Sequence, residues 1–188
     1  QRQMCIETEL QWIEKTLASS AEKWKIVIGH HPVYADTPKE ESERADMRKR
    51  LEPLLDRYGV DMYFCGHIHN FQHIQPADSK VDYLVNTSVS LSRKVKTVEG
   101  TKFCNPEAGF TVVSMEDSKL SFYLMNGKGK ILYGTAEQDN TIEKEHIYSL
   151  LVGNLLVFHM QGDSGHFLLV ENMKIDSFDF VILLSDYK

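Results

Sequence analysis

The stretch that decides the fold is YFCGHIHN, residues 63–70, in which an apolar run ends at a glycine and two histidines follow one residue apart. In an extended backbone, side chains at positions i and i+2 point the same way, so we expect His67 and His69 to aim at one point. A second stretch, KIVIGHHP at residues 25–32, repeats the order of apolar run, glycine and histidine. The two stretches therefore predict two strands that both end at histidines.

The segment between these strands predicts a helix that crosses from one to the other. Its apolar residues recur at helical spacing: Met47, Leu51, Leu54, Leu55 and Tyr58. Pro53 is expected to kink or restart this helix, and Gly59 to end it. Such a connection makes the two strands parallel neighbours through a right-handed crossover. Both glycine-histidine corners then lie at the carboxyl ends of the strands, where open α/β sheets place their sites.

The histidines at these corners, His30, His67 and His69, are the candidate metal ligands. Neutral imidazole suits zinc, iron, manganese and copper, and a preceding glycine lets the backbone approach an ion closely. The alternative is that they are loop histidines with satisfied hydrogen bonds. His31 and His73 are weaker candidates, either as groups that support a ligand, donate a proton or contact phosphate, or as solvated loop residues.

The composition limits the class of protein. The chain has 188 residues and 42% hydrophobic content, which suffice for one domain with a sizeable core. Its 21 basic and 27 acidic residues give a net charge of −6, which argues against nucleic acid or an anionic membrane as the main partner. The longest apolar stretch, residues 147–160, is shorter than the ~20 residues that a membrane-spanning helix needs.

The rest of the chain divides into two parts. An amphipathic helix is expected over residues 4–20, and short strands follow His73, at residues 81–85, 110–115, 120–125 and 131–133. After residue 138 the apolar runs follow no pattern that we can place. We therefore predict one domain portion over residues 1–138 and a tail of unknown structure over residues 139–188, either an added module or non-native sequence.

The segment from residue 88 to residue 106 is predicted to be a long polar loop. Loops of this length in compact domains tend to be functional. It carries four basic residues, Arg93, Lys94, Lys96 and Lys102. This cluster either attracts an anionic substrate or forms a solvated surface.

With these residues identified, the chain resembles the purple acid phosphatases of the small tartrate-resistant type, within the calcineurin-like metallophosphoesterases. GHHPVY at residues 29–34 is similar to the family's Gly-His-x-Pro motif, and GHIHN at residues 66–70 matches its Gly-His-x-His motif. The flanks QWI, residues 11–13, and LEPLL, residues 51–55, agree as well. The resemblance covers residues 1–135 and implies an α/β fold, the C-terminal half of a four-layer α/β/β/α metallophosphoesterase sandwich.

The resemblance implies a binuclear metal centre of Fe(III) beside Fe(II), Zn(II) or Mn(II). By resemblance, His30 and His67 would bind the divalent ion and His69 the ferric ion. Two such ions would clamp a phosphate and activate a hydroxide for in-line attack. The implied substrate is a phosphorylated small molecule or a phosphoprotein, with no nucleic-acid or membrane partner. Family members are commonly secreted, periplasmic or lysosomal, whereas the residues themselves leave the location open.

The chain departs from the family in the ligands that come earlier in the family's sequence. The motifs that carry the bridging aspartate, the tyrosinate and the asparagine ligand are absent. The chain is therefore expected to be a portion that needs the N-terminal half of the same domain and is inactive alone. Where small members carry a histidine proton donor, this chain has Asp36, Lys39 and Glu40, so the general acid stays unassigned.

Three functions remain under consideration. The first is metal-dependent hydrolysis of phosphate monoesters, of the acid phosphatase type. The second is phosphodiester hydrolysis, as in other members of the superfamily. The third is a non-catalytic module in which the histidines hold a single metal ion, although structural zinc sites usually have four ligands, often including cysteine.

Overall fold

The computed structural model describes residues 2–38, 41–88, 91–115 and 119–134, and four later segments at residues 147–152, 155–162, 165–172 and 180–183. These residues form three helices and twelve strands. In chain order they are α1 (Arg2–Ser19), β1 (Lys25–Ile28), α2 (Glu41–Arg50), α3 (Glu52–Arg57), β2 (Met62–Cys65), β3 (Phe71–Ile74), β4 (Asp82–Val85), β5 (Thr101–Asn105), β6 (Gly109–Met115), β7 (Leu120–Asn126), β8 (Ile131–Gly134), β9 (Ile147–Val152), β10 (Leu155–Gly162), β11 (Gly165–Asn172) and β12 (Phe180–Leu183).

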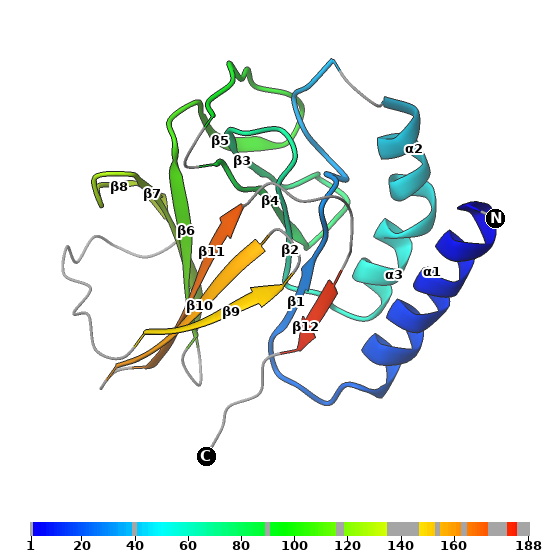
Figure 1. The fold of residues 1–188 in the computed structure, drawn as a ribbon. Coiled ribbons are helices and arrows are strands. Elements are labelled where there is room, and N and C mark those ends of the chain that lie inside the picture. Colours follow the sequence, from blue (N-terminus) through cyan, green and yellow to red (C-terminus); the bar gives the residue numbers. More distant parts are fainter. Residues whose placement is uncertain are drawn as a thin grey trace.

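The strands form two six-stranded sheets that pack against each other, and the helices cover the outer face of one of them (Figure 1). The helix-covered sheet has the order β12-β1-β2-β4-β3-β5, and the second sheet has the order β8-β7-β6-β11-β10-β9. This is the mixed α/β architecture that the sequence predicts. Of the four predicted layers, the described residues show three, which are the helices and the two sheets.

After Lys25, which begins β1, the residues of β1 and β2 are apolar because both faces of these strands are covered. Val27 and Tyr63 pack with the helices, in the same core cluster as Leu17 of α1 and Leu55 of α3. The alternate residues, represented by Phe64, pack with side chains of the second sheet. Burial on both faces explains why these strands read as continuous apolar runs rather than as alternating patterns.

The crossover between β1 and β2 is confirmed. The two strands are parallel, with Ile26 opposite Met62. The predicted helix is divided into α2 and α3, which restarts with a proline in its first turn, as predicted for Pro53. Gly59 has a φ of +62°, the left-handed conformation that ends a helix and that glycine adopts without a steric penalty.

The predicted helix over residues 4–20 and the predicted short strands are also confirmed, as α1, β4, β6, β7 and β8. The loop predicted over residues 88–106 is wrong in its last part, because residues 101–105 form β5 on the edge of the helix-covered sheet. β3 was not predicted and directly follows the histidine motif. No helix among the described residues is both long and apolar enough to cross a membrane.

The later segments add strands to both sheets. β12 pairs antiparallel with the free edge of β1, with Lys25 opposite Leu183. In the second sheet, β11 pairs antiparallel with β6, with Val113 opposite Leu168. The division of the chain at residue 138 stays a prediction.

Candidate metal centre

The candidate site lies just beyond the carboxyl ends of the adjacent parallel strands β1 and β2. The pairing of these strands continues past their ends through two backbone hydrogen bonds. Gly29 N–H donates to the carbonyl of Phe64 at 2.8 Å, and Gly66 N–H donates to the carbonyl of His30 at 3.2 Å. The two glycine-histidine corners are thereby held side by side at one edge of the sheet, as the sequence predicts.

Three histidines gather at this edge. His30 Nε2 lies 3.1 Å from His67 Nδ1. The ring of His31 stacks on that of His67, with 4.4 Å between the ring centroids and 25° between the planes. One ring nitrogen from each of the three lies within 4.8 Å of the others. His31 Nδ1 also pairs with the carboxylate of Glu43, on α2, at 3.2 Å. We call His30, His31 and His67 the histidine cluster.

His69 does not belong to the histidine cluster. The expectation of an extended backbone through this motif is wrong, because β2 ends at Cys65 and both His67 and His69 have positive φ angles, of 65° and 64°. Left-handed backbone at a residue other than glycine costs on the order of 1–3 kcal/mol and concentrates at functional sites. The role of His69 as a ligand stays a prediction. The third member of the histidine cluster is His31 instead. The alternation of side chains along a strand, on which the prediction of His69 rested, did not indicate this residue.

The geometry of the histidine cluster suits a metal ion. Two imidazole nitrogens that bind one tetrahedral ion at about 2.0–2.1 Å lie about 3.3 Å apart, close to the spacing of His30 and His67. The same spacing also suits a direct hydrogen bond between two neutral rings. A carboxylate near the second nitrogen of a ligand histidine helps to orient the ring, and the Glu43 carboxylate lies 3.2 Å from His31 Nδ1.

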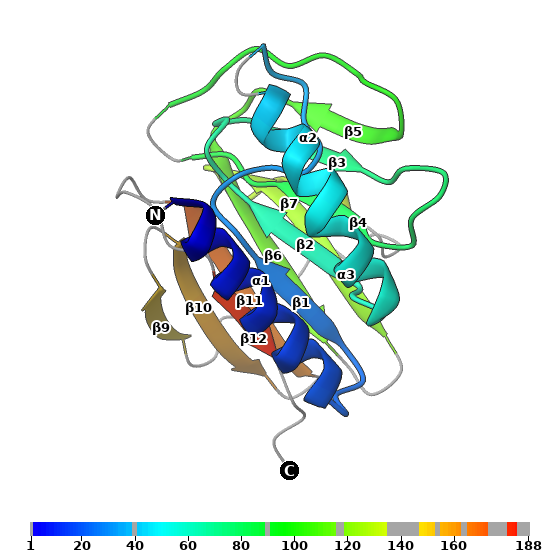
Figure 2. The ribbon, with the colours of Figure 1, turned by 90° about the vertical axis from the view of Figure 1, so that its right-hand side faces the viewer.

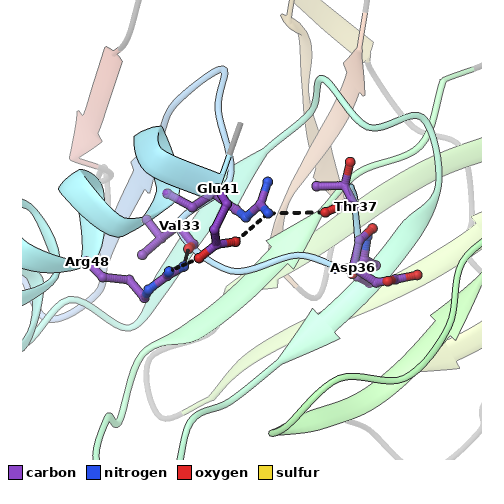
Figure 3. Close-up of polar contacts among 7 residues, drawn as sticks. Val33, Asp36, Thr37, Glu41 and Arg48 are labelled. Carbon is purple, nitrogen blue, oxygen red and sulfur yellow. Dashed lines mark hydrogen bonds and ion pairs between the residues drawn. The ribbon is translucent and has the colours of Figure 1, made fainter. Parts of the chain in front are cut away.

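Helix α2 holds the loop that follows the first histidine corner (Figure 3). The buried guanidinium of Arg44 donates to the carbonyl of Thr37 at 3.1 Å and to the carboxylate of Glu41 at 2.6 Å. Arg48 donates to the carbonyl of Val33 at 3.0 Å and to the other oxygen of Glu41. Hydrogen bonds from Arg48 and then Arg44 lower the pKa of Glu41 below its ordinary value. Residues 33–37 are therefore tied to a rigid element.

A second network joins that loop to the segment after β4. Asp36 N–H donates to Gln72 Oε1 at 2.6 Å, and Gln72 Nε2 donates to Asn70 Oδ1 at 2.8 Å. Lys96 N–H donates to Asp36 Oδ2 at 2.6 Å, and Asn70 Nδ2 contacts the carbonyl of Lys94 at 3.4 Å. Asn70 and Gln72 are almost fully buried. Sequence reasoning missed them, although a polar amide within a buried strand and another just before it are a usable signal, because buried amides need partners.

His73 lies between the two sheets rather than in the histidine cluster. It is 4% exposed, its Nε2 pairs with Asp82 Oδ1 at 2.8 Å, and its Nδ1 lies 3.1 Å from the hydroxyl of Tyr133. Burial, and then the charge of Asp82, raises the pKa of Tyr133. His73 therefore has satisfied hydrogen bonds within the core.

Comparisons with known proteins find a matching family and several relatives. Residues 2–71 match the calcineurin-like phosphoesterase family. The tartrate-resistant acid phosphatase type 5 of Rattus norvegicus is 32% identical over 139 residues, which are 69% of this chain and 42% of the relative. Purple acid phosphatase 4 of Arabidopsis thaliana is 30% identical over 136 residues, 70% of this chain and 40% of the relative. The chain thus spans less than half the length of these relatives.

Two solved structures share the fold. A purple acid phosphatase from yellow lupin seeds superposes with a TM-score of 0.53 at 20% identity, over 66% of this chain and 27% of the other. GAP50, described as the anchor in the inner membrane complex of Plasmodium, superposes with a TM-score of 0.60 at 22% identity, over 69% of this chain and 41% of the other. The sequence motifs and the family match identify residues 2–71 as part of a calcineurin-like phosphoesterase domain, in a chain that is similar to tartrate-resistant and purple acid phosphatases.

Proposed function

We propose that the whole protein hydrolyses phosphate monoesters at a binuclear metal centre to which this chain contributes His30, His67 and His69. The observation that carries the proposal is the 3.1 Å approach of His30 and His67 at the carboxyl ends of β1 and β2. The acid phosphatase relatives support the same reaction class. Because the chain spans 42% of the rat relative's length, we propose that the remaining ligands come from the part of the domain that this match does not cover.

The residues of this chain would bind and orient the metal. Metal ions in such a centre, when bound, neutralise phosphate charge and supply a hydroxide at moderate pH. His30 and His67 would each present a neutral ring nitrogen to the same ion. The ring of His31 stacks on that of His67, and the Glu43 carboxylate lies beside His31 Nδ1, so His31 would help to orient His67. The arginines of α2 hold the loop beside these rings.

One observation favours a second candidate, a module that binds a single metal ion without catalysis. The histidine cluster has three imidazoles within 4.8 Å and includes no carboxylate among the described residues. Three neutral nitrogens suit one zinc ion, and a binuclear centre needs a bridging ligand that this cluster does not supply. Metal content distinguishes the two candidates.

The test compares this chain with the protein extended to the full length of its gene. We expect the extended protein to hold two metal ions and to hydrolyse para-nitrophenyl phosphate faster than the bis ester. His30→Ala and His67→Ala should abolish the activity and lower the metal content, whereas His73→Asn, outside the histidine cluster, serves as the control for loss of a histidine. One zinc ion bound tightly by both forms, with no hydrolysis by either, would overturn the proposal in favour of the single-metal module.

A further inference from the structure

We propose that residues 91–98, here called the basic loop, form a second anion-binding site, which holds an acidic group of the substrate other than the phosphate that reacts. This inference rests on the proposed function, because it assigns a substrate class to the same site. The ligand chemistry is a phosphate monoester whose organic part carries a further phosphate or carboxylate. The sequence leaves open whether these basic residues attract an anionic substrate or form a solvated surface, and the contacts of the loop favour the first.

The main chain of the basic loop is fixed to residues of the candidate site by three contacts. Arg93 N–H donates to the carbonyl of His69 at 3.0 Å. The carbonyl of Lys94 accepts from Asn70 Nδ2 at 3.4 Å, and Lys96 N–H donates to Asp36 Oδ2 at 2.6 Å. The loop therefore lies across the two segments that follow the histidine corners. Figure 2 shows it at the upper end of the sheet, beyond the carboxyl end of β2.

The charge of the basic loop opposes that of the rest of the chain. Residues 91–98 contain Arg93, Lys94 and Lys96 and no acidic residue, whereas the whole chain has a net charge of −6. Lys94 and Lys96 are exposed, and Arg93 is half-buried. Within the part of the chain that the structure describes, these three side chains take part in no ion pair. A concentrated positive charge beside a site raises the local concentration of anionic substrates.

The basic loop also exposes apolar surface. Among the described residues, three large hydrophobic side chains are exposed, and two of them, Leu91 at 41% and Val98 at 37%, lie in this loop. A basic surface that only contacts solvent would not require exposed apolar side chains. It would also not require main-chain hydrogen bonds to residues of the site. Together with the three cations, these two features suit a ligand that has an apolar body between two anionic groups.

The experiment uses the full-length protein and a matched set of substrates. Phenyl phosphate has no second anion, 4-carboxyphenyl phosphate has a carboxylate, and 1,4-phenylene bisphosphate has a second phosphate. The variant is R93A/K94A/K96A. The control is K119A/K128A/K130A, which removes the same charge from exposed positions before β7 (Lys119) and between β7 and β8 (Lys128 and Lys130).

For the loop variant, we expect kcat/KM to fall roughly tenfold more for the two substrates with a second anion than for phenyl phosphate, mainly through KM, because three cations near one anion are lost. The control should not discriminate among the substrates. A selective loss of kcat/KM for both 4-carboxyphenyl phosphate and 1,4-phenylene bisphosphate identifies a general anion site. A selective loss for the bisphosphate alone identifies a phosphate site. Equal losses for all three substrates, or equal discrimination by the control, would overturn the proposal.

Failure of the proposed function gives a different result. If the full-length protein hydrolyses none of the three substrates, the phosphatase proposal fails, and calorimetric titration with 1,4-phenylene bisphosphonate then tests the anion site by itself. Binding that weakens about tenfold in the loop variant and not in the control supports the anion site. No binding, or binding that both variants weaken equally, refutes it.

Discussion

Replacement of Arg44 by alanine tests how α2 holds the loop after the first histidine corner. Arg44 is 5% exposed and donates to the carbonyl of Thr37 at 3.1 Å and to Glu41 at 2.6 Å. A hydrogen bond from a charged donor contributes about 1.5–3 kcal/mol. The ion pair adds little to this, because the side chain of Glu41 is 66% exposed and solvent screens its charge. We expect the free energy of unfolding to fall by about 2–3 kcal/mol.

The assay is urea unfolding followed by fluorescence and circular dichroism. With a slope of about 2 kcal/mol/M, the expected loss lowers the midpoint by about 1–1.5 M. The matched control is Arg50→Ala on the same helix. Arg50 pairs with Asp46 at i,i+4, and both side chains are at least 35% exposed, so its loss should cost only about 0.3–0.5 kcal/mol.

Hydrogen exchange at a single amide tests the loop directly, in addition to the unfolding of the whole protein. The loop held by Arg44 includes Asp36, whose carboxylate accepts from Lys96 N–H. Hydrogen exchange at Lys96 should therefore speed up in the Arg44 variant and stay unchanged in the Arg50 variant. If the two variants have midpoints within about 0.3 M of each other and the same exchange at Lys96, the assignment of Arg44 as the anchor of this loop is wrong.

Three further predictions concern other parts of the structure. Gly100→Ala should destabilise the protein by about 1–2 kcal/mol more than Gly129→Ala, as measured by urea unfolding. Both glycines have a φ near +80°, so the backbone strain of an alanine is the same at the two positions. Of the two, only Gly100 would bring the added Cβ to 2.8 Å from a backbone oxygen, that of Gln75. Burial raises the pKa of Asp61, so the stability of the wild type relative to Asp61→Asn should fall as the pH rises from about 4 to 7; a constant difference over that range would contradict this. His67→Ala should weaken zinc binding by more than about 100-fold in competition with a chromophoric chelator, and unchanged affinity would show that the histidine cluster holds no ion.

The sequence by itself determined the part of the fold that depends on local pattern. The apolar runs before Gly29 and Gly66 identify strands, because strands buried on both faces must be apolar throughout. The helical stripe between them makes the strands parallel neighbours, which brings the two histidine corners to one edge. Pro53 and Gly59 mark the restart and the end of the crossover because their restrictions act within a few residues.

Tertiary structure decided the arrangement within the site. The left-handed backbone of His67 and His69 cannot be read from a pattern of side chains, since these conformations cost energy that only the surrounding contacts offset. His31 joins the cluster through its contacts with His67 and Glu43 rather than through its spacing. The basic loop is fixed by hydrogen bonds to residues 24 to 60 positions away, as with Asn70 and Lys94 or Asp36 and Lys96. Contacts between positions so distant in sequence leave no periodic signal, so only the folded chain shows them.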